Sequence, residues 1–207
     1  MTMRLVESIK EIIMNKIDAK GLLCPKPVIL TKKALEEAEN EAVETTVDNE
    51  VAVENLKKLA ESLKCDYKTE NLSENEFRVT ITKSGLEESA AADEKEGPFT
   101  LAISNEFMGG GEEELGKILM KSFLYTVSET KPYPTTIVFY NSGVRLTTEG
   151  SESLEEIKKL ESEGVEIISC GTCLDYYNLK EKLEVGSISN MYTIYEKLAV
   201  EKNVIIR

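Results

Sequence analysis

Histidine and tryptophan are both absent from this 207-residue sequence. Without histidine the chain lacks the usual general base, the commonest metal ligand, and every Ser-His or Cys-His nucleophile pair. The side chains that remain for chemistry are cysteines, carboxylates, lysines and hydroxyls.

Basic residues are also scarce, since 25 lysines and arginines stand against 38 aspartates and glutamates, for a formal net charge of -13. Such a chain lacks the basic surface that neutralises phosphates, so we expect no nucleic-acid partner. No run of residues is long and apolar enough to cross a bilayer, and residues 1–8 lack the apolar core of a signal peptide. We therefore expect no membrane partner and a cytoplasmic location.

Four cysteines are present, and in a reducing compartment they suit catalysis, sulfur transfer or metal binding better than structural disulfides. Zinc is disfavoured because a closed zinc site needs four ligands, no histidine is available, and Cys65 has no spacing partner. We expect neither a metal nor another cofactor, and we interpret Cys65 as a small apolar filler.

Residues 18–27, with the sequence DAKGLLCPKP, place a cysteine at the start of a predicted helix. Pro25 suits the first helical position and favours extended backbone before it, so Cys24 is predicted at or beside the N-cap. There the helix dipole favours the thiolate, Lys26 adds positive charge, and Pro27 stiffens the first turn. These features predict a sulfur nucleophile in fixed geometry, with a half-buried structural cysteine as the alternative.

Residues 14–83 predict a β-α-β-α-β-β order. The expected elements are a strand near residue 17, a helix over 25–39, a strand over 43–47, a helix ending near 64, and strands near 67 and over 77–82. Asp48 and Asn49 are candidate caps of the second helix. Two amphipathic helices on a one-sided sheet predict a two-layer α/β sandwich.

The flanking segments differ in composition from this domain. Residues 84–97 are acidic and poor in large apolar side chains, which predicts a linker. Residues 1–13 have apolar side chains at helical spacing and predict an amphipathic N-terminal extension. The expected domains are therefore 14–83 and 98–207.

From residue 98 onward, strands and helices alternate. Strands are predicted over 99–104, 135–140 and 165–169, near 188 and over 204–206, and helices over 111–127, 154–162, from 174, and over 191–200. This alternation predicts a mostly parallel, flavodoxin-like sheet with helices on both faces. Ser153 and Glu156 predict a capping box for the helix over 154–162, and Gly164 predicts its end.

Ligands of open parallel sheets bind outside the carboxyl ends of the strands, where three segments of this domain are predicted to meet. The residues expected there are Asn105, Asn141, Cys170, Gly171, Thr172 and Cys173. The last four form a Cys-x-x-Cys at a strand-to-helix junction, which can close a disulfide or favour one thiolate. The alternative is two small buried residues beside a tight turn.

The motif formed by Asp18, Gly21, Cys24, Pro25 and Pro27, followed by the β-α-β-α-β-β order, resembles the TusA/SirA family of small sulfur-carrier proteins over about residues 15–83. In that family the cysteine of the Cys-Pro-x-Pro motif accepts sulfur as a persulfide and passes it on. The resemblance implies this role for Cys24.

Residues 99–207 resemble a DsrE-like domain, whose active cysteine follows the third strand of a flavodoxin-like sheet; this implies an active role for Cys170. Together the two halves are similar to the YedF family, called sulfurtransferase-like selenium metabolism proteins. This resemblance implies sulfur or selenium handling, and domains of the second kind often form homo-oligomers.

The leading interpretation is a transferase-like relay. Cys24 receives sulfur or selenium from a donor such as a cysteine desulfurase and passes it to Cys170 or an external acceptor, after which Cys173 attacks Cys170 and expels the cargo. The alternatives are a thiol–disulfide redox protein or sensor built on Cys170 and Cys173, and a non-catalytic assembly module.

Overall fold

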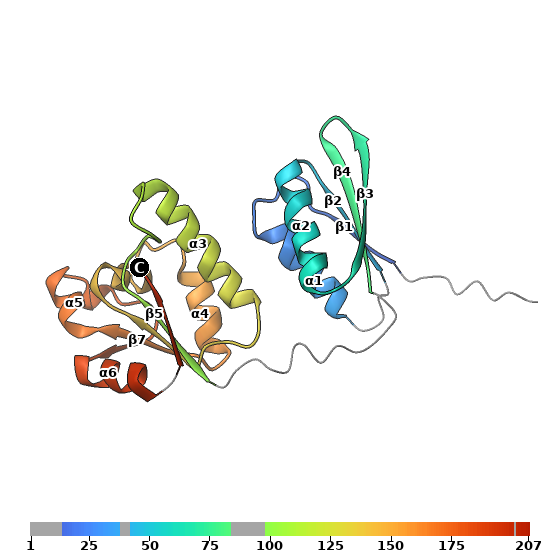
Figure 1. The fold of residues 1–207 in the computed structure, drawn as a ribbon. Coiled ribbons are helices and arrows are strands. Elements are labelled where there is room, and N and C mark those ends of the chain that lie inside the picture. The colour runs from blue at the N-terminus through green and yellow to red at the C-terminus, as the bar shows by residue number, and fades with distance from the viewer. Residues whose placement is uncertain (1–13, 38–41, 84–97, 201) are drawn as a thin grey trace, which may run out of the picture. The chain divides into compact units, whose positions relative to one another are not determined.

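The computed structural model describes residues 14–37, 42–83, 98–200 and 202–207, and the chain divides into two units, residues 1–88 and 89–207 (Figure 1). The predicted N-terminal extension, the predicted linker and the end of the helix predicted over 25–39 lie outside the described residues. The domain boundaries placed there remain predictions.

The described part of the first unit has the expected order of strands and helices. These are β1 (Met14–Asp18), α1 (Lys26–Glu36), β2 (Ala42–Val47), α2 (Glu50–Ser62), β3 (Asp66–Ser73) and β4 (Glu76–Thr82). The sheet order is β1-β2-β4-β3, with β1 and β2 parallel and the other pairs antiparallel. Figure 1 shows α1 and α2 on one face of this sheet, which confirms the two-layer sandwich.

Packing between β2, β4 and the helices forms the core of this unit. Val43, Val79 and Ile81 are fully buried, as is Leu56 of α2, because the sheet turns one face toward the helices. Thr31 of α1 ties the two layers together: its hydroxyl is 2.8 Å from the Pro27 carbonyl oxygen and 2.7 Å from Thr45 Oγ1.

A side-chain cap fixes the start of α2. Asn49 has extended backbone, and its Oδ1 accepts a hydrogen bond from the Ala52 N–H at 2.8 Å. This confirms Asn49 as the cap and satisfies one of the N–H groups that a helix start leaves open. It also fixes the first turns of α2, which lie beside Cys24.

The second unit follows the predicted alternation. Its elements are β5 (Phe99–Ile103), α3 (Glu113–Glu129), β6 (Thr136–Phe139), the 3-10 helix η1 (Asn141–Thr147), α4 (Leu154–Ser162), β7 (Glu166–Cys170), α5 (Gly171–Tyr176), the 3-10 helix η2 (Lys180–Lys182), β8 (Ser187–Ser189), α6 (Met191–Val200) and β9 (Lys202–Ile206). The sheet order is β8-β7-β6-β5-β9, and all neighbouring strands are parallel.

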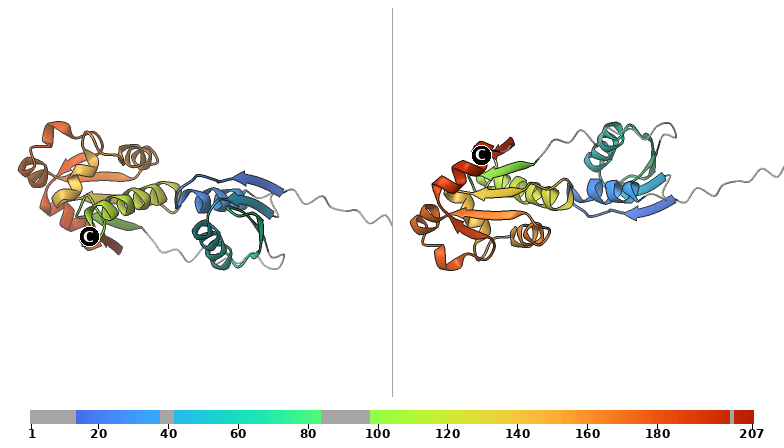
Figure 2. Two further views of the ribbon diagram at one scale, coloured as in Figure 1. Left: turned by 90° about the horizontal axis from the view of Figure 1, so that it is seen from above. Right: turned by 90° about the horizontal axis from the view of Figure 1, so that it is seen from below.

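Helices cover both faces of this sheet, with α3 and α4 on one side and α6 on the other (Figure 1 and Figure 2). All four residues of β6 are buried, as expected for a central strand covered on both faces. The predicted α/β class is therefore confirmed. No helix in the described ranges has the length and apolarity needed to cross a membrane.

Two local predictions in this unit are wrong. Ser153 occupies the N-cap of α4 but makes no side-chain cap hydrogen bond, since its backbone (φ -107°, ψ 9°) is not extended as a capping residue requires. The helix predicted from residue 174 begins at Gly171 instead, directly after β7. The predicted end of α4 does hold, because Gly164 follows it with a φ of +94°.

Candidate functional site

Cys24 lies exposed in the loop between β1 and α1. Pro25 takes the N-cap position and α1 begins at Lys26, so Cys24 precedes the cap and Pro27 lies in the first turn. The prediction that Pro25 is the first helical residue is therefore wrong by one position. The Ile29 N–H donates to the Pro25 carbonyl oxygen at 3.1 Å and the Lys26 N–H donates to the Leu23 carbonyl oxygen at 3.0 Å, so the backbone on both sides of Cys24 is fixed.

The motif residues before Cys24 shape its loop. Gly21 has a φ of +74°, a conformation that glycine adopts without steric cost. Its N–H donates to Asp48 Oδ2 at 2.7 Å, and this bond is the main cause that lowers the pKa of Asp48. Asp18 Oδ1 accepts from the Lys20 N–H at 3.2 Å. The loop is thus bound both to itself and to the connection between β2 and α2.

A cavity of about 320 Å³ opens beside the Cys24 sulfur. It is lined by Leu22, Leu23, Cys24, Pro27, Val28, Asn49, Val51, Ala52 and Asn55. Leu23 is 82% exposed and Val51 is 68% exposed, and exposed apolar side chains of this kind, gathered at a cavity, are typical of contact surfaces. The sulfur therefore lies at the edge of an apolar depression.

Asn55 supplies a polar group in this depression. Its Nδ2 is 3.8 Å from Cys24 Sγ and donates a weak hydrogen bond to it. Asn55 was not among the site residues predicted from the sequence. It lies between Ala52 and Leu56, which are buried in α2, and a polar residue at such a position was the feature of the sequence that could have indicated it. The exposed sulfur thus has one hydrogen-bond donor, which α2 supplies.

In the second unit, the segments that follow β5, β6 and β7 meet as predicted. Ser142 Oγ donates to Asn105 Oδ1 at 2.7 Å, and the Asn141 N–H donates to Cys173 Sγ at 3.1 Å. Parallel strands direct their carboxyl ends to one edge of a sheet, and this arrangement brings three distant segments together there.

Cys170 and Cys173 are both free thiols, but they differ in exposure. Cys170 ends β7 and is 2% exposed, whereas Cys173 is half-buried in α5. Gly171 lies against β8, because a Cβ there would be 3.1 Å from Ile188 Cγ2. Thr172 is exposed and Cys65 is half-buried.

The pKa of the Cys173 thiol is raised to about 11, first by burial and then by the side-chain hydrogen bond with Cys170. The N–H of Asn141 acts in the opposite direction and lowers this pKa. A lowered pKa, one of the outcomes expected for this cysteine pair, is therefore wrong for Cys173, because loss of hydration outweighs the single donor.

Side chains that were not predicted connect to Asn141, the residue whose N–H donates to this thiol. The Tyr177 hydroxyl donates to Asn141 Oδ1 at 3.1 Å, and the Arg145 guanidinium carbon is 4.6 Å from the centre of the Tyr177 ring. Arg145 Nε also pairs with Glu106 Oε1 at 3.4 Å. These contacts join residues far apart in the sequence, and no local pattern indicated them.

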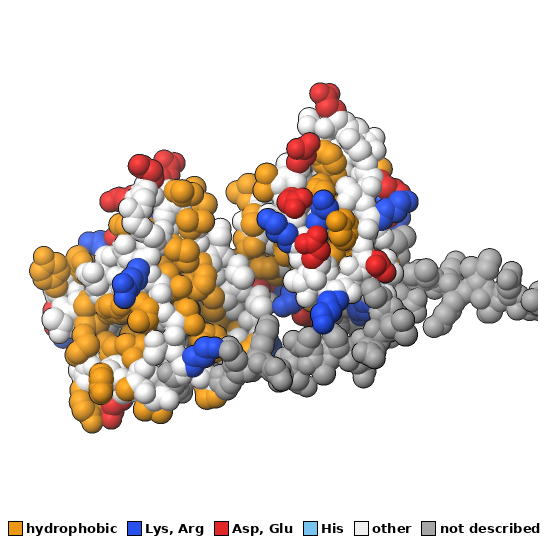
Figure 3. Space-filling view, in the orientation of Figure 1, with side chains coloured by type: hydrophobic (Ala, Val, Ile, Leu, Met, Phe, Trp, Pro, Cys, Tyr) orange, Lys and Arg blue, Asp and Glu red, His pale blue; other side chains and the backbone are white. Residues whose placement is uncertain are grey.

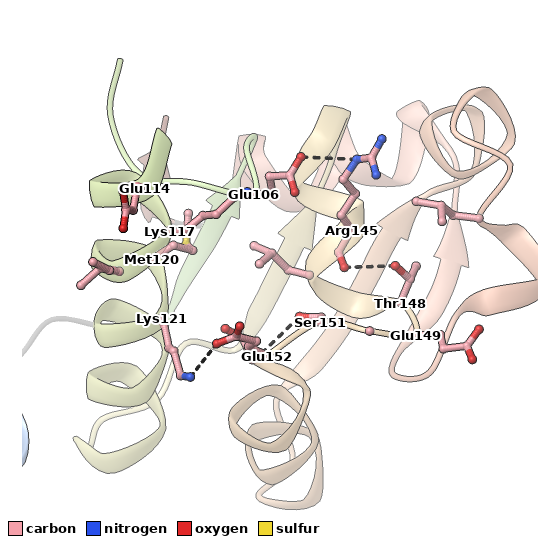
Figure 4. Close-up of a pocket in the computed structure, with 15 residues that line it drawn as sticks. Glu106, Glu114, Lys117, Met120, Lys121, Arg145, Thr148, Glu149, Ser151 and Glu152 are labelled. Carbon is pink, nitrogen blue, oxygen red and sulfur yellow. Dashed lines mark hydrogen bonds and ion pairs between the residues drawn. The ribbon is translucent and has the colours of Figure 1, made fainter. Parts of the chain in front are cut away.

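A second cavity, of about 510 Å³, lies between α3 and the segment from η1 to the start of α4 (Figure 4). Arg145 lines it, and a Lys121 Nζ to Glu152 Oε2 pair at 2.7 Å lies at its other end. The cavity therefore borders the residues around Cys173, although none of the predicted site residues lines it. In the described ranges, no three side chains of the metal-binding types form a group able to hold an ion.

The fold and the cysteines define a two-unit α/β protein with one exposed thiol beside a helix start and a thiol pair at the carboxyl edge of a parallel sheet. Residues 15–83 match the family described as sulfurtransferase TusA, and residues 88–206 match the DsrE/DsrF-like family. The chain belongs to the DsrE/DsrF-like family and carries a TusA-family unit before it, which confirms both resemblances.

The chain is also similar to individual proteins. The chain is 42% identical over 73 residues to a Methanocaldococcus jannaschii protein named as a sulfur carrier, covering 35% of this chain and 97% of that protein. A SirA-like protein from Desulfitobacterium hafniense is 36% identical (TM-score 0.32), covering 34% of this chain and 96% of its own. The ychN protein from E. coli is 11% identical (TM-score 0.42), covering 52% of this chain and 97% of its own.

Proposed function

We propose that this protein carries sulfur, or selenium, on Cys24 and delivers it to the Cys170 and Cys173 pair or to an external acceptor. The families and the sulfur-carrier relative support a role in sulfur relay. The observation that carries the proposal is the exposed Cys24 sulfur at the edge of an apolar depression, with the Asn55 amide donating to it.

The loading step is a displacement at sulfur. The Cys24 thiolate attacks the outer sulfur of a donor persulfide, R–S–SH, and forms Cys24–S–SH as the donor leaves as a thiol. Selenium in the same position of the donor undergoes the same displacement. The donor is a persulfide-bearing enzyme such as a cysteine desulfurase, and the exposed rim of Leu23 and Val51 offers a surface for that enzyme.

The second thiol site supplies an acceptor on the same chain. A tether raises the effective concentration of one site at the other, so transfer within one chain needs no strong contact between the units. The reducing cytoplasm, where thiols persist, is the compartment that we assign to this chemistry. The YedF-like role in selenium metabolism is part of this proposal.

A redox function of the second unit is the alternative that the geometry favours next. Cys170 and Cys173 share a side-chain hydrogen bond, so their sulfurs are close enough to interact. If the unit is a redox device, the pair has a reduction potential near that of the cytosol and cycles fully in a Cys24→Ser variant.

Self-association of the second unit stays a prediction. Leu115, Ile118 and Leu119 of α3 are exposed, and Figure 3 shows hydrophobic side chains gathered over this helix. Exposed apolar side chains at helical spacing are typical of a contact surface.

Intact mass tests the proposed function. The full chain is incubated with a cysteine desulfurase and cysteine, and the expected product carries one additional sulfur atom on Cys24. A Cys24→Ser variant is expected to stay unmodified at this position, and a Cys65→Ser variant is the matched control that still loads. An unmodified wild-type chain, under conditions that load a known carrier, contradicts the proposal.

A further inference from the structure

The two cysteines of the second unit differ in how an incoming sulfur can reach them. Cys170 is 2% exposed and belongs to the buried core together with Ile168 of the same strand, whereas Cys173 is only half-buried. Thiol exchange requires the attacking sulfur to contact the sulfur that it attacks. Contact with Cys170 therefore requires the end of β7 to open, and contact with Cys173 does not.

A hydrogen-bond donor already points at the more accessible sulfur. The Asn141 N–H donates to Cys173 Sγ at 3.1 Å. Asn141 begins η1 with a φ of +51°, in the left-handed region that asparagine tolerates better than most residues. This backbone donor stabilises negative charge on Cys173 during attack and on a persulfide formed there.

Tyr177 holds this donor in place. Its hydroxyl donates to Asn141 Oδ1 at 3.1 Å, and it directly follows α5, the helix that carries Cys173. Arg145 lies over one face of the ring at 4.6 Å, and Tyr176 contacts the ring edge-on at 5.0 Å between centroids. The hydroxyl thus connects the end of the thiol's own helix to the residue that donates to the thiol.

We propose that Cys173 is the thiol at which sulfur enters the second unit, that Asn141 and Tyr177 are its positioning residues, and that Cys170 is the resolving thiol. This rests on the proposed sulfur-relay function and reverses the order expected from the sequence, in which Cys170 receives the sulfur and Cys173 resolves it.

The proposed transfer has two steps. First, Cys173 loses its proton and, as a thiolate, attacks the outer sulfur of R–S–SH. The S–S bond of the donor breaks, Cys173–S–SH forms, and the donor takes up a proton and leaves as R–SH. Cys170 then loses its proton and attacks Cys173 Sγ, which expels hydrosulfide and forms the Cys170–Cys173 disulfide. The cargo leaves with the two electrons supplied by the cysteine pair, and an external dithiol reduces the disulfide for the next cycle.

Site-resolved alkylation of the reduced, full chain tests the order of the thiols without any sulfur donor. A brief pulse of iodoacetamide is followed by peptide mass spectrometry, which quantifies each cysteine separately. We expect Cys173 to be labelled at least about tenfold faster than Cys170, because labelling of a buried thiol requires local opening. Equal or faster labelling of Cys170 overturns the proposal, and this readout does not depend on whether Cys24 carries sulfur.

Two tyrosine variants separate positioning from a merely structural role. Tyr177→Phe removes the hydroxyl that holds Asn141, and we expect the pH profile of Cys173 alkylation to move to higher pH. Tyr176→Phe is the matched control, because Tyr176 is 79% exposed and touches the same ring, and its profile is expected to match that of the wild type. Overlapping profiles for Tyr177→Phe and the wild type remove Tyr177 from the proposal.

Inorganic polysulfide tests the entry step directly. We expect Cys170→Ala to retain a sulfur adduct on Cys173, since no resolving thiol remains, and Cys173→Ala to gain no adduct on Cys170. A Cys173→Ala chain that loads sulfur on Cys170 as fast as the wild type loads its second unit overturns the assignment.

Discussion

The two thiol sites of this protein differ in how exposed their sulfur atoms are. Cys24 lies exposed in a loop beside an apolar depression, where another protein can reach it. The Cys170 and Cys173 pair lies at the carboxyl end of β7, where one thiol is buried and the other is half-buried. Exposure suits collecting sulfur from a protein donor, and burial with a second thiol suits releasing it in reduced form.

Each site also directs an asparagine N–H at one sulfur. At Cys24 the donor is the side-chain amide of Asn55, at 3.8 Å, and at Cys173 it is the backbone N–H of Asn141, at 3.1 Å. The shorter contact lies in the less hydrated site, yet it does not offset the burial that raises the pKa of Cys173 to about 11. At Cys173, burial therefore outweighs the hydrogen bond.

The largest expected difference between the sites is the pH dependence of Cys173. Its raised pKa of about 11 leaves it mainly a thiol at neutral pH. Since the thiolate is the nucleophile, alkylation at Cys173 is expected to rise about tenfold per pH unit above pH 7 until the pKa is approached. Alkylation rates measured by peptide mass spectrometry over about three pH units above neutrality check this.

Cys170 offers a control for that profile. Cys170 raises the pKa of Cys173 through a hydrogen bond and through its charge, so Cys170→Ala is expected to shift the profile to lower pH. A Cys173 rate that does not change with pH, or an upward shift in Cys170→Ala, contradicts this account.

The apolar rim of the Cys24 site gives the next effect. Val51→Asp places a charge on a rim side chain that is 68% exposed, and loading by a desulfurase is expected to slow about tenfold because the donor loses apolar contact and meets an unpaired charge. Alkylation of Cys24 by a small neutral reagent is the internal control and is expected to fall much less, because the reagent needs no docking surface. If both rates fall together, the effect lies in the thiol and the rim is not a docking surface.

Asn55 gives a smaller effect. Asn55→Leu removes the amide that donates to Cys24, and loading is expected to slow several-fold, consistent with a weak hydrogen bond worth about 1 kcal/mol. Asn55→Asp is expected to slow loading more, because a carboxylate opposes negative charge on the sulfur. Lys58→Ala, an exposed position on the same helix, is the control, and an Asn55→Asp chain that loads at its rate removes the amide from the account.

Glycine substitutions compare the backbones that support the two sites. At Gly143, in the same 3-10 helix as Asn141, an added Cβ would clash with the Ile103 carbonyl oxygen, so Gly143→Ala is expected to lower the free energy of unfolding by about 1–3 kcal/mol. Gly21 has free space around it but a φ of +74°, so Gly21→Ala costs about 1–2 kcal/mol through backbone strain alone. Denaturant unfolding measures both, and a neutral Gly143→Ala contradicts the close packing.

Local signals made most of the fold predictable. Hydrophobic periodicity indicated the strands and helices, and Asn49 was identified as a cap because capping is a contact between residues three apart. Cys24 was found because proline, glycine and cysteine at fixed spacing dictate a loop and a helix start.

Contacts between distant segments were not predictable. Asn55 is 31 residues from Cys24, and Asn141 is 32 residues from Cys173, and such pairs depend on helix placement and strand register. The order proposed for the second thiol pair differs from the order expected from the sequence for a related reason. The helix was expected from residue 174 but begins at Gly171, and this extra turn makes Cys173 a helical residue beside Asn141.

Transfer of labelled sulfur tests the central claim most directly. The full chain is loaded with radiolabelled sulfur from a desulfurase, the donor is removed, and the label on each cysteine is followed by peptide analysis. The account predicts that label appears first on Cys24, then leaves it as hydrosulfide is released in the wild type, and accumulates on Cys173 in Cys170→Ala. Label that reaches the second unit of a Cys24→Ser chain at the wild-type rate, or that never occupies Cys24, contradicts the relay.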